Sequence, residues 1–178
     1  MRLFIAINFS DKTLSALLEL RNNLRGKSIR GNFSAPENLH LTLAFLDECD
    51  EKQFIAAKTA MEEVMFQPIK VEINRIGLFK RGSGGIWWAG VRENKPLMAL
   101  QRDLTNKLIT AGFKLDTRKY SPHITLGREV VTDEHERALT PFGETINAID
   151  LMVSERIGGK LTYTALYTKL GHAQNPWA

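Results

Sequence analysis

The sequence predicts an α+β fold with two lobes, each a mostly antiparallel sheet with helices on its outer face. Two observations lead to this prediction. Strand-like and helix-like segments alternate along the chain, and their order recurs: strand, helix, His-x-Thr-Leu strand and helix, then strands, helix and a second His-x-Thr-Leu strand. Since sheets and helices must each bury an apolar face, this order is typical of packed sheet and helix layers. The recurrence indicates an internal duplication.

The first part of the chain holds two predicted strands and two predicted helices. Residues 2–9 (RLFIAINF) are rich in β-favouring residues and predict a buried strand. The next helix begins at Ser10 or Asp11, both N-cap residue types, and its leucines recur at helical spacing. Residues 40–46 (HLTLAFL) predict a strand, and residues 50–66 predict a helix with one apolar face that ends before a proline.

The second part begins with an alternating strand over residues 69–79. A glycine-rich turn, RGSGG, then leads into a second strand, IWWAGV, and together these segments predict a hairpin. Residues 94–113 predict an amphipathic helix that closes near a glycine. Residues 122–127 (PHITLG) mirror the earlier motif strand, and residues 146–170 predict a closing hairpin with a Gly-Gly turn.

Composition limits the class of protein. The chain has 178 residues, of which 43% are hydrophobic and 25% charged, so it can bury a core, and we expect one bilobal domain over residues 1–178. No apolar run approaches the roughly 20 residues that span a bilayer. The N-terminal apolar stretch is too short for a signal peptide, so we expect a cytoplasmic protein without membrane contact. We also expect a monomer, although the sequence does not decide the oligomeric state. The single cysteine, Cys49, cannot form a disulfide within the chain and is expected to be an unreactive surface or half-buried thiol.

The net charge is positive and unevenly distributed. It amounts to +4, with a pI near 9.3, and basic residues gather in residues 21–30, 79–82 and 117–120. Such patches attract phosphates, so they favour an anionic partner, and their extent favours a polynucleotide over a small nucleotide. A solvated basic face is the alternative interpretation.

Two polar pairs interrupt the apolar motif strands. Side chains alternate across a strand, so His40 and Thr42 share one face, while Leu41, Leu43 and Phe45 are expected on the other, in the core. The same alternation applies to His123 and Thr125 in the second motif. The chain has only four histidines, and two of them lie in His-x-Thr-Leu, which a chance match does not explain. His135 and His172, among charged or tail residues, are expected on the surface.

The repeated pair suits phosphoryl chemistry. With an unperturbed pKa near 6.5, one imidazole can accept a proton while the other donates one at physiological pH. In-line displacement at phosphorus needs this division, and threonine hydroxyls can bind the non-bridging oxygens. A core histidine bonded to the backbone would explain one motif but not two. A zinc site would need further ligands that neither motif carries, so we expect neither metal nor cofactor.

At these residues the chain resembles the two-histidine phosphoesterase superfamily, and within it the RNA 2′,3′-cyclic phosphodiesterases, also called 2′-5′ RNA ligases. The likeness rests on NLHLTLAFL and PHITLGR, with support from RLFIAI, WWAGV and a late Tyr-Thr strand. The resemblance implies two lobes related by a pseudo-twofold axis, with the motifs meeting across a central cleft. It also implies metal-independent hydrolysis of an RNA or nucleoside 2′,3′-cyclic phosphate to a 2′-phosphate, and reversible, ATP-independent 2′-5′ ligation at the same site.

The resemblance assigns roles to both motifs. His40 is implied as the general acid that protonates the departing ribose O3′, and His123 as the base that activates water. These two roles exchange in the reverse reaction. Thr42 and Thr125 are implied to hold phosphate oxygens.

Other residues near the motifs are expected to contact substrate or to support the site. Arg128 matches the family arginine that grips the phosphate, with a surface arginine as the alternative. Phe45 matches an aromatic that stacks on the terminal base, although strict alternation places it in the core. Gly127 replaces a bulkier residue and is expected to loosen the backbone at Arg128. Trp87 and Trp88 point to opposite faces, and core packing is expected for both.

Two other functions stay open from the sequence. One is a non-catalytic RNA- or nucleotide-binding module that uses the same basic surface without turnover. The other keeps the chemistry but moves it to a small nucleotide, such as an ADP-ribose-derived cyclic phosphate or a 2′-5′ oligoadenylate.

Overall fold

The computed structural model describes residues 1–172 of the chain. Within them lie nine strands, three α-helices and one short 3₁₀ helix. In chain order these are β1 (Arg2–Ile7), α1 (Asp11–Gly26), β2 (Ser28–Phe33), η1 (Pro36–Asn38), β3 (Leu41–Glu48), α2 (Glu51–Glu62), β4 (Ile69–Arg81), β5 (Gly84–Val91), α3 (Lys95–Thr110), β6 (His123–Thr132), β7 (Arg137–Ile146), β8 (Ala148–Ile157) and β9 (Lys160–Leu170).

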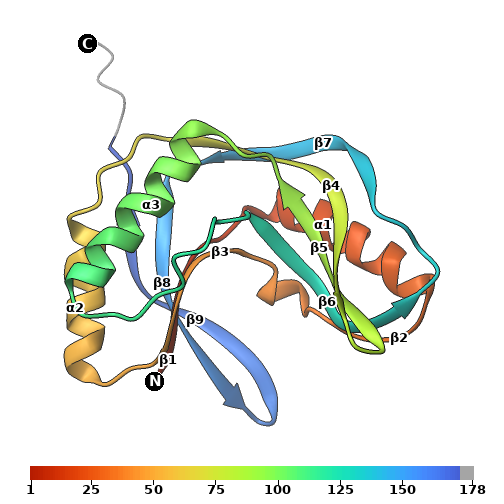
Figure 1. Ribbon diagram of the computed structural model, residues 1–178, viewed down its shortest axis with the longest axis horizontal. Helices are drawn as coiled ribbons and strands as arrows, with labels where there is room; N and C mark the ends of the chain where they lie inside the picture. Colours follow the sequence, from red (N-terminus) through yellow and green to blue (C-terminus); the bar gives the residue numbers. More distant parts are fainter. Residues whose placement is uncertain (173–178) are drawn as a thin grey trace.

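The strands form two sheets, and every neighbouring pair is antiparallel. The four-stranded sheet has the order β3-β1-β8-β9, and the five-stranded sheet has the order β2-β6-β5-β4-β7 (Figure 1). Each motif strand pairs with an earlier strand of its own sheet: β3 with β1, with α1, β2 and η1 between them in the chain, and β6 with β5, with α3 between them. Two antiparallel sheets with three α-helices confirm the predicted α+β fold class.

The helices connect the lobes as well as covering them. Helix α1 leaves β1 of the four-stranded sheet but contacts β2 and β7 of the five-stranded sheet. Along the chain, helix α3 connects β5 and β6 of the five-stranded sheet, yet it packs against α2 and contacts β3 of the four-stranded sheet. Helix α2 begins with a capping box between Asp50 and Gln53 and ends at Glu62, earlier than the predicted residue 66. There the chain turns away, and the Phe66 carbonyl accepts a hydrogen bond from the His172 amide.

One contiguous hydrophobic core includes residues from both sheets and all three α-helices. A second, small cluster of Phe4, Ala6 and Met152, with Tyr163 packed against it, is separate from this core. Trp87 belongs to the main core, whereas Trp88 is buried outside both clusters and contacts His123. The two side chains point to opposite faces of β5, as predicted. Core packing is confirmed for Trp87 but is wrong for Trp88, which is buried beside His123.

Two strands were not predicted, and both are edges of the five-stranded sheet. Strand β2 (SIRGNF) carries arginine, glycine and asparagine in place of an apolar alternation. Strand β7 contains Pro141 and also Gly143, whose φ is +150°. A proline inside a strand is tolerated at an edge because no second neighbour needs its missing N–H. Neither strand therefore has a sequence pattern that resembles a central strand.

Two smaller expectations concern the membrane and the cysteine. Among residues 1–172, no helix is both long enough and apolar enough to cross a membrane.

Cys49 is buried, deeper than expected, and its thiol donates to the Leu46 carbonyl at 3.4 Å. Because burial raises the pKa of this thiol, it stays protonated, which agrees with the expected lack of reactivity.

Candidate active site

His40 lies between η1 and β3, where two hydrogen bonds fix its ring. Its Nδ1 is 2.7 Å from the Asn38 carbonyl oxygen, and its Nε2 is 2.9 Å from Thr42 Oγ1. A carbonyl can only accept, so Nδ1 carries the proton in the neutral ring and Nε2 is the atom that gains or loses one. The ring packs on Phe4 at 4.9 Å and meets the edge of Tyr163 at 5.3 Å between centroids.

His123 repeats this arrangement at the start of β6. Its Nδ1 is 2.7 Å from the Ser121 carbonyl oxygen, so the same tautomer is fixed. Its ring meets Phe79 edge-on at 5.2 Å and lies 6.1 Å from Trp88. In contrast to His40, the Nε2 of His123 makes no hydrogen bond with any residue from 1 to 172. It is therefore the nitrogen available to take a proton from a bound molecule.

The surroundings favour the neutral form of both rings. Burial lowers the pKa of His40, and the hydrogen bond to Asn38 opposes this shift. Burial also lowers the pKa of His123, against the bond to Ser121, and the positive charge of Arg128 lowers it further. Both imidazoles are thus suited to accept a proton near neutral pH.

Two reciprocal hydrogen bonds hold the motif strands together. Tyr120, just before the second motif, donates its hydroxyl to the Thr42 carbonyl of β3 at 2.7 Å. Ser34, just before the first motif, donates its hydroxyl to the Thr125 carbonyl of β6, also at 2.7 Å. Each motif threonine is therefore held by the segment that leads into the other motif, and β3 contacts β6 directly. The two motifs, remote in sequence, meet in space.

A β-bulge occupies the same position in both motifs. In β3, Ala6 pairs with Thr42 but Ile5 pairs with Ala44, so Leu43 is the extra residue. In β6, Trp88 pairs with Thr125 but Trp87 pairs with Gly127, so Leu126 is the extra residue. An extra residue reverses the alternation beyond it. The fifth residue after each histidine consequently returns to the face that carries the histidine and threonine, here named the motif face of each sheet.

These bulges correct the predicted position of Phe45. Strict alternation placed Phe45 in the core, but its side chain is 61% exposed on the motif face, with its ring 6.3 Å from Phe4. Arg128 holds the equivalent place in β6 and is exposed. The prediction from strict alternation fails after the bulged leucine of each motif, Leu43 or Leu126.

Arg128 links the surroundings of the two histidines. Its charge lowers the pKa of His123 and also acts on Tyr163, whose pKa burial raises. Tyr163 in turn contacts His40. Gly127 does not loosen this region, because the space above it is filled: an added Cβ would lie 2.9 Å from Val130 Cγ2 and 3.0 Å from Phe33 Cδ1.

The sequence reasoning missed several residues of this site. Tyr163, Phe4 and Phe79 contact the histidine rings, and Tyr120 and Ser34 hold the motif threonines. Tyr120 could have been noticed from its place three residues before His123. The others lie on strands remote in sequence and carry no motif of their own.

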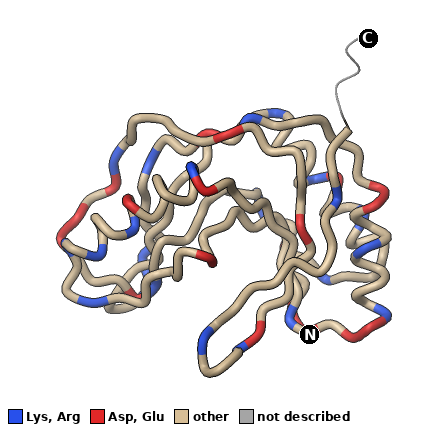
Figure 2. The backbone as a smooth tube through the Cα atoms, turned by 180° about the vertical axis from the view of Figure 1, so that it is seen from behind, with Lys and Arg blue, Asp and Glu red and all other residues tan. Residues whose placement is uncertain are grey.

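The basic segments are less available than their sequence indicated. Arg118 holds Asp116 in a bidentate ion pair that lowers the pKa of that carboxyl to about 2. Lys119 pairs with Glu93 at 3.3 Å, and Arg21 is buried in α1. Acidic and basic residues are interspersed along the backbone (Figure 2). Residues 117–120 are therefore largely neutralised, which weakens their predicted role in attracting RNA.

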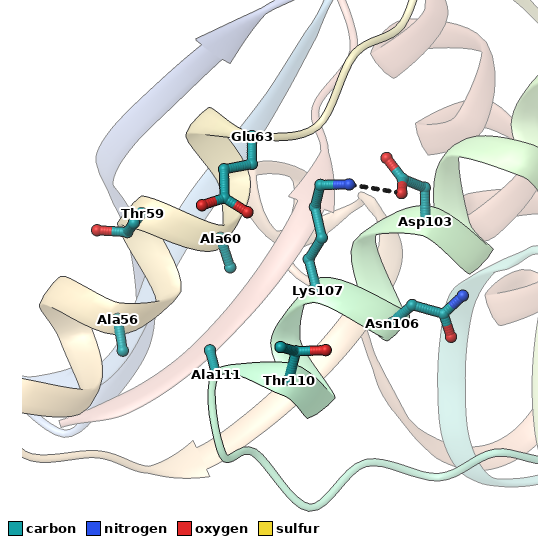
Figure 3. A pocket seen from close by; sticks show the side chains of 9 residues that line it. All are labelled: Ala56, Thr59, Ala60, Glu63, Asp103, Asn106, Lys107, Thr110 and Ala111. Carbon is teal, nitrogen blue, oxygen red and sulfur yellow. Dashed lines mark hydrogen bonds and ion pairs between the residues drawn. The ribbon is translucent and has the colours of Figure 1, made fainter.

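A groove of about 460 Å³ between α2 and α3 lies elsewhere and contains none of the motif residues (Figure 3). It is lined by Ala56, Thr59, Ala60, Glu63, Asp103, Asn106, Lys107, Thr110 and Ala111. Its most prominent interaction is an ion pair one helical turn apart, Lys107 to Asp103 at 2.7 Å. Such pairs are common on helix surfaces, and the groove does not contribute to the histidine site.

Comparison with known proteins agrees with this geometry. The family model of LigT-like phosphoesterases matches residues 8–88 and 90–152. The chain belongs to the LigT-like phosphoesterase family. The predicted superfamily membership and the predicted class of enzyme, a cyclic phosphodiesterase, are confirmed by this match together with the relatives described next.

Two curated relatives with the same name are similar over most of this chain. The RNA 2′,3′-cyclic phosphodiesterase of Archaeoglobus fulgidus is 35% identical over 129 residues, which cover 72% of each chain. The RNA 2′,3′-cyclic phosphodiesterase of Thermotoga maritima is 34% identical over 131 residues, 72% of this chain and 70% of the relative.

Two solved structures have the same fold as this chain. E. coli LigT in complex with 3′-AMP superposes with a TM-score of 0.82 at 23% identity, covering 96% of this chain and 97% of that one. A Thermus thermophilus protein also gives 0.82, at 22% identity, covering 98% and 100%.

Proposed function

We propose that the protein hydrolyses the 2′,3′-cyclic phosphate end of RNA to a 2′-phosphate by acid–base catalysis between His40 and His123. The observation that carries the proposal is the pair of imidazoles, each fixed through Nδ1 to a backbone carbonyl, on two strands that reciprocal hydrogen bonds hold together. The curated relatives, which are RNA 2′,3′-cyclic phosphodiesterases, support this choice of substrate.

In the proposed mechanism the phosphate lies between the two motifs. His123 Nε2, which has no partner among residues 1–172, takes a proton from water as the water oxygen attacks phosphorus. The bond from phosphorus to O3′ breaks, and protonated His40 gives its Nε2 proton to the departing O3′. The 2′-phosphate remains, and the two histidines have exchanged their protonation states, which solvent restores.

Thr42, Thr125 and Arg128 surround the reacting phosphate in this proposal. The threonine hydroxyls and the guanidinium donate to the non-bridging oxygens, where negative charge gathers in the transition state. Phe45, exposed on the same face, stacks on the terminal base. When an RNA 5′-hydroxyl takes the place of water, the same displacement forms a 2′-5′ linkage without ATP.

The test uses purified protein and a short RNA with a 2′,3′-cyclic phosphate end, in buffer containing EDTA. We expect conversion to the 2′-phosphate, and a loss of about 10²–10⁴-fold in kcat for His40→Ala and for His123→Ala. His135→Ala, which changes an exposed histidine outside the site, is the matched control. Binding of the RNA without turnover between about pH 5 and 8, where imidazole changes charge, would instead favour a non-catalytic binding module.

A further inference from the structure

The five-stranded sheet carries an arginine beside His123 that the proposed mechanism does not use. Arg75 on β4 pairs with Gly90 on β5, and Gly90 pairs with His123 on β6. Directly paired residues of antiparallel strands point to the same face. Arg75 therefore lies on the motif face, two strands from His123, or about 9–10 Å between Cα atoms at the usual strand spacing.

The absence of a side chain at Gly90 lets Arg75 lie flat on the sheet. A Cβ added there would be 2.6 Å from Arg75 Cγ and 2.8 Å from its Nε. The guanidinium is 5.3 Å from the ring of Trp88, the same indole that contacts His123. Stacking on an aromatic face fixes a guanidinium but leaves its in-plane N–H groups able to donate.

No residue from 1 to 172 forms an ion pair or a side-chain hydrogen bond with Arg75. The nearby carboxylate of Glu72, on the same strand, is held by Arg92 at 2.9 Å. Arg75 is half-buried and its guanidinium lies over the Trp88 ring, so its charge is oriented without being neutralised. An oriented, unpaired guanidinium next to a phosphate site is suited to bind a second phosphate.

Further features of the motif face extend toward the tip of the β4–β5 hairpin. Phe79, which contacts Trp88 and His123, and Arg81 follow Arg75 at even spacing on β4 and so share its face. Arg30 reaches the hairpin turn, where it donates to Ser83 Oγ at 3.2 Å. Arginines with an aromatic ring between them are the usual elements of a single-stranded nucleic-acid track.

We propose that Arg75 binds the phosphodiester on the 5′ side of the terminal nucleotide, and that the motif face of β4 and β5 guides the RNA strand. The proposal rests on the proposed function and extends the recognised substrate from a single nucleotide to an RNA strand. A cyclic phosphate closes the 3′ end of RNA, so the next phosphate along the chain lies to its 5′ side. The basic segment at 117–120 is correspondingly less important than its charge indicated.

The test compares two substrates in wild type and Arg75→Gln: a nucleoside 2′,3′-cyclic phosphate, and a tetranucleotide with the same cyclic end. We expect the ratio of kcat/KM, tetranucleotide over nucleoside, to fall about tenfold in Arg75→Gln, from the loss of one charge-assisted hydrogen bond. For the tetranucleotide, the logarithm of the binding constant falls with the logarithm of the salt concentration. The steepness of this fall should be smaller by about 0.7 in Arg75→Gln. Arg102→Gln, which removes an exposed arginine of α3, should leave the ratio unchanged.

Two outcomes overturn the subsite. An equal loss for both substrates means that Arg75 acts only through Trp88 and His123, and no loss for either means that it binds no phosphate. If the wild type turns over neither substrate, the proposed function fails, and the subsite is then tested by binding alone. A tetranucleotide 2′-phosphate must then bind wild type more tightly than Arg75→Gln, while a nucleoside 2′-phosphate shows a smaller difference.

Discussion

The reciprocal hydrogen bonds between the motifs give a prediction that separates positioning from stability. Tyr120→Phe removes only the hydroxyl that donates to the Thr42 carbonyl, while the ring stays packed against the core. Burial raises the pKa of Tyr120, so this hydroxyl stays protonated and donates throughout the range in which the histidines titrate. Ser34→Ala removes the equivalent bond to the Thr125 carbonyl.

The magnitude follows from the partly buried setting of both bonds. Each variant loses a hydrogen bond of about 0.5–1.5 kcal/mol and leaves a carbonyl partly unsatisfied, so about 1–2 kcal/mol of stability is expected to disappear. For a chain of this length, that lowers the melting temperature by roughly 2–8 °C. More than 99% of the protein still remains folded at 25 °C if the starting stability is typical, about 5–15 kcal/mol. A fall in kcat there reports displaced catalytic groups, since even about 1 Å of misplacement can cost 10²-fold.

The assay combines thermal melting with steady-state hydrolysis in the two single variants and the double variant. We expect kcat to fall about tenfold in Tyr120→Phe, with KM nearly unchanged, and the two changes to couple by more than about 0.5 kcal/mol, because both bonds hold one contact between β3 and β6. Tyr167→Phe is the matched control, since its hydroxyl has no hydrogen-bond partner within residues 1–172. Wild-type kcat in Tyr120→Phe, or strictly additive effects, would refute the role of these bonds in positioning.

Three further predictions concern the same site. Because burial lowers the pKa of both histidines, the bell-shaped profile of kcat/KM should be centred below about pH 6.5. A profile centred above pH 7 contradicts this prediction. The contribution of the two neutral histidines to folding stability, present above about pH 6.5, should be lost as the pH falls through their lowered pKa values. Arg128→Gln should raise the pKa of His123, followed by NMR titration, and leave that of His40 nearly unchanged; no shift means that the two do not interact. Phe45→Leu should raise KM for a cyclic-phosphate nucleotide about 5- to 150-fold through lost base stacking, and an unchanged KM places the base elsewhere.

Central elements could be predicted from the sequence because their patterns are strong. The strands that hold the motifs, the three α-helices and both glycine-turn hairpins follow from periodicity and turn residues alone. Gly158 and Gly159, with φ of 58° and 80°, fulfil the turn that their pairing predicted. The two edge strands, β2 and β7, lacked such a pattern because an edge has one hydrogen-bonding neighbour and often an exposed face.

The site was predictable up to the point where tertiary pairing overrides local alternation. The faces of His40 and Thr42, and of His123 and Thr125, follow from the two-residue period of a strand. Beyond each threonine a bulge at Leu43 or Leu126 reverses the period. A bulge depends on how the neighbouring strand aligns, which a single segment does not specify. The same limitation hides Tyr120 and Ser34, whose partners lie across the junction between the lobes.

The two motif strands become chemically different at the second residue after each bulge. One half presents the aromatic ring of Phe45, and the other presents the charge of Arg128. A nucleotide with its base on Phe45 and its phosphate near Arg128 would turn its ribose toward the four-stranded sheet, and hence O3′ toward His40. Water would then approach from His123. This orientation accounts for the proposed division between acid and base, although both rings are fixed through Nδ1 to a backbone carbonyl.

The division can be tested with a substrate whose bridging 3′ oxygen is replaced by sulfur. A thiol has a pKa near 8.5, far below that of a ribose hydroxyl, so the thiolate leaves without protonation. His40→Ala should therefore hydrolyse the sulfur substrate at a rate close to that of the wild type, whereas His123→Ala, which still lacks the base, should remain slow. Both variants are compared on the oxygen substrate as the reference. Rescue of His123→Ala in place of His40→Ala would reverse the two roles, and rescue of neither would show that leaving-group protonation does not limit the reaction.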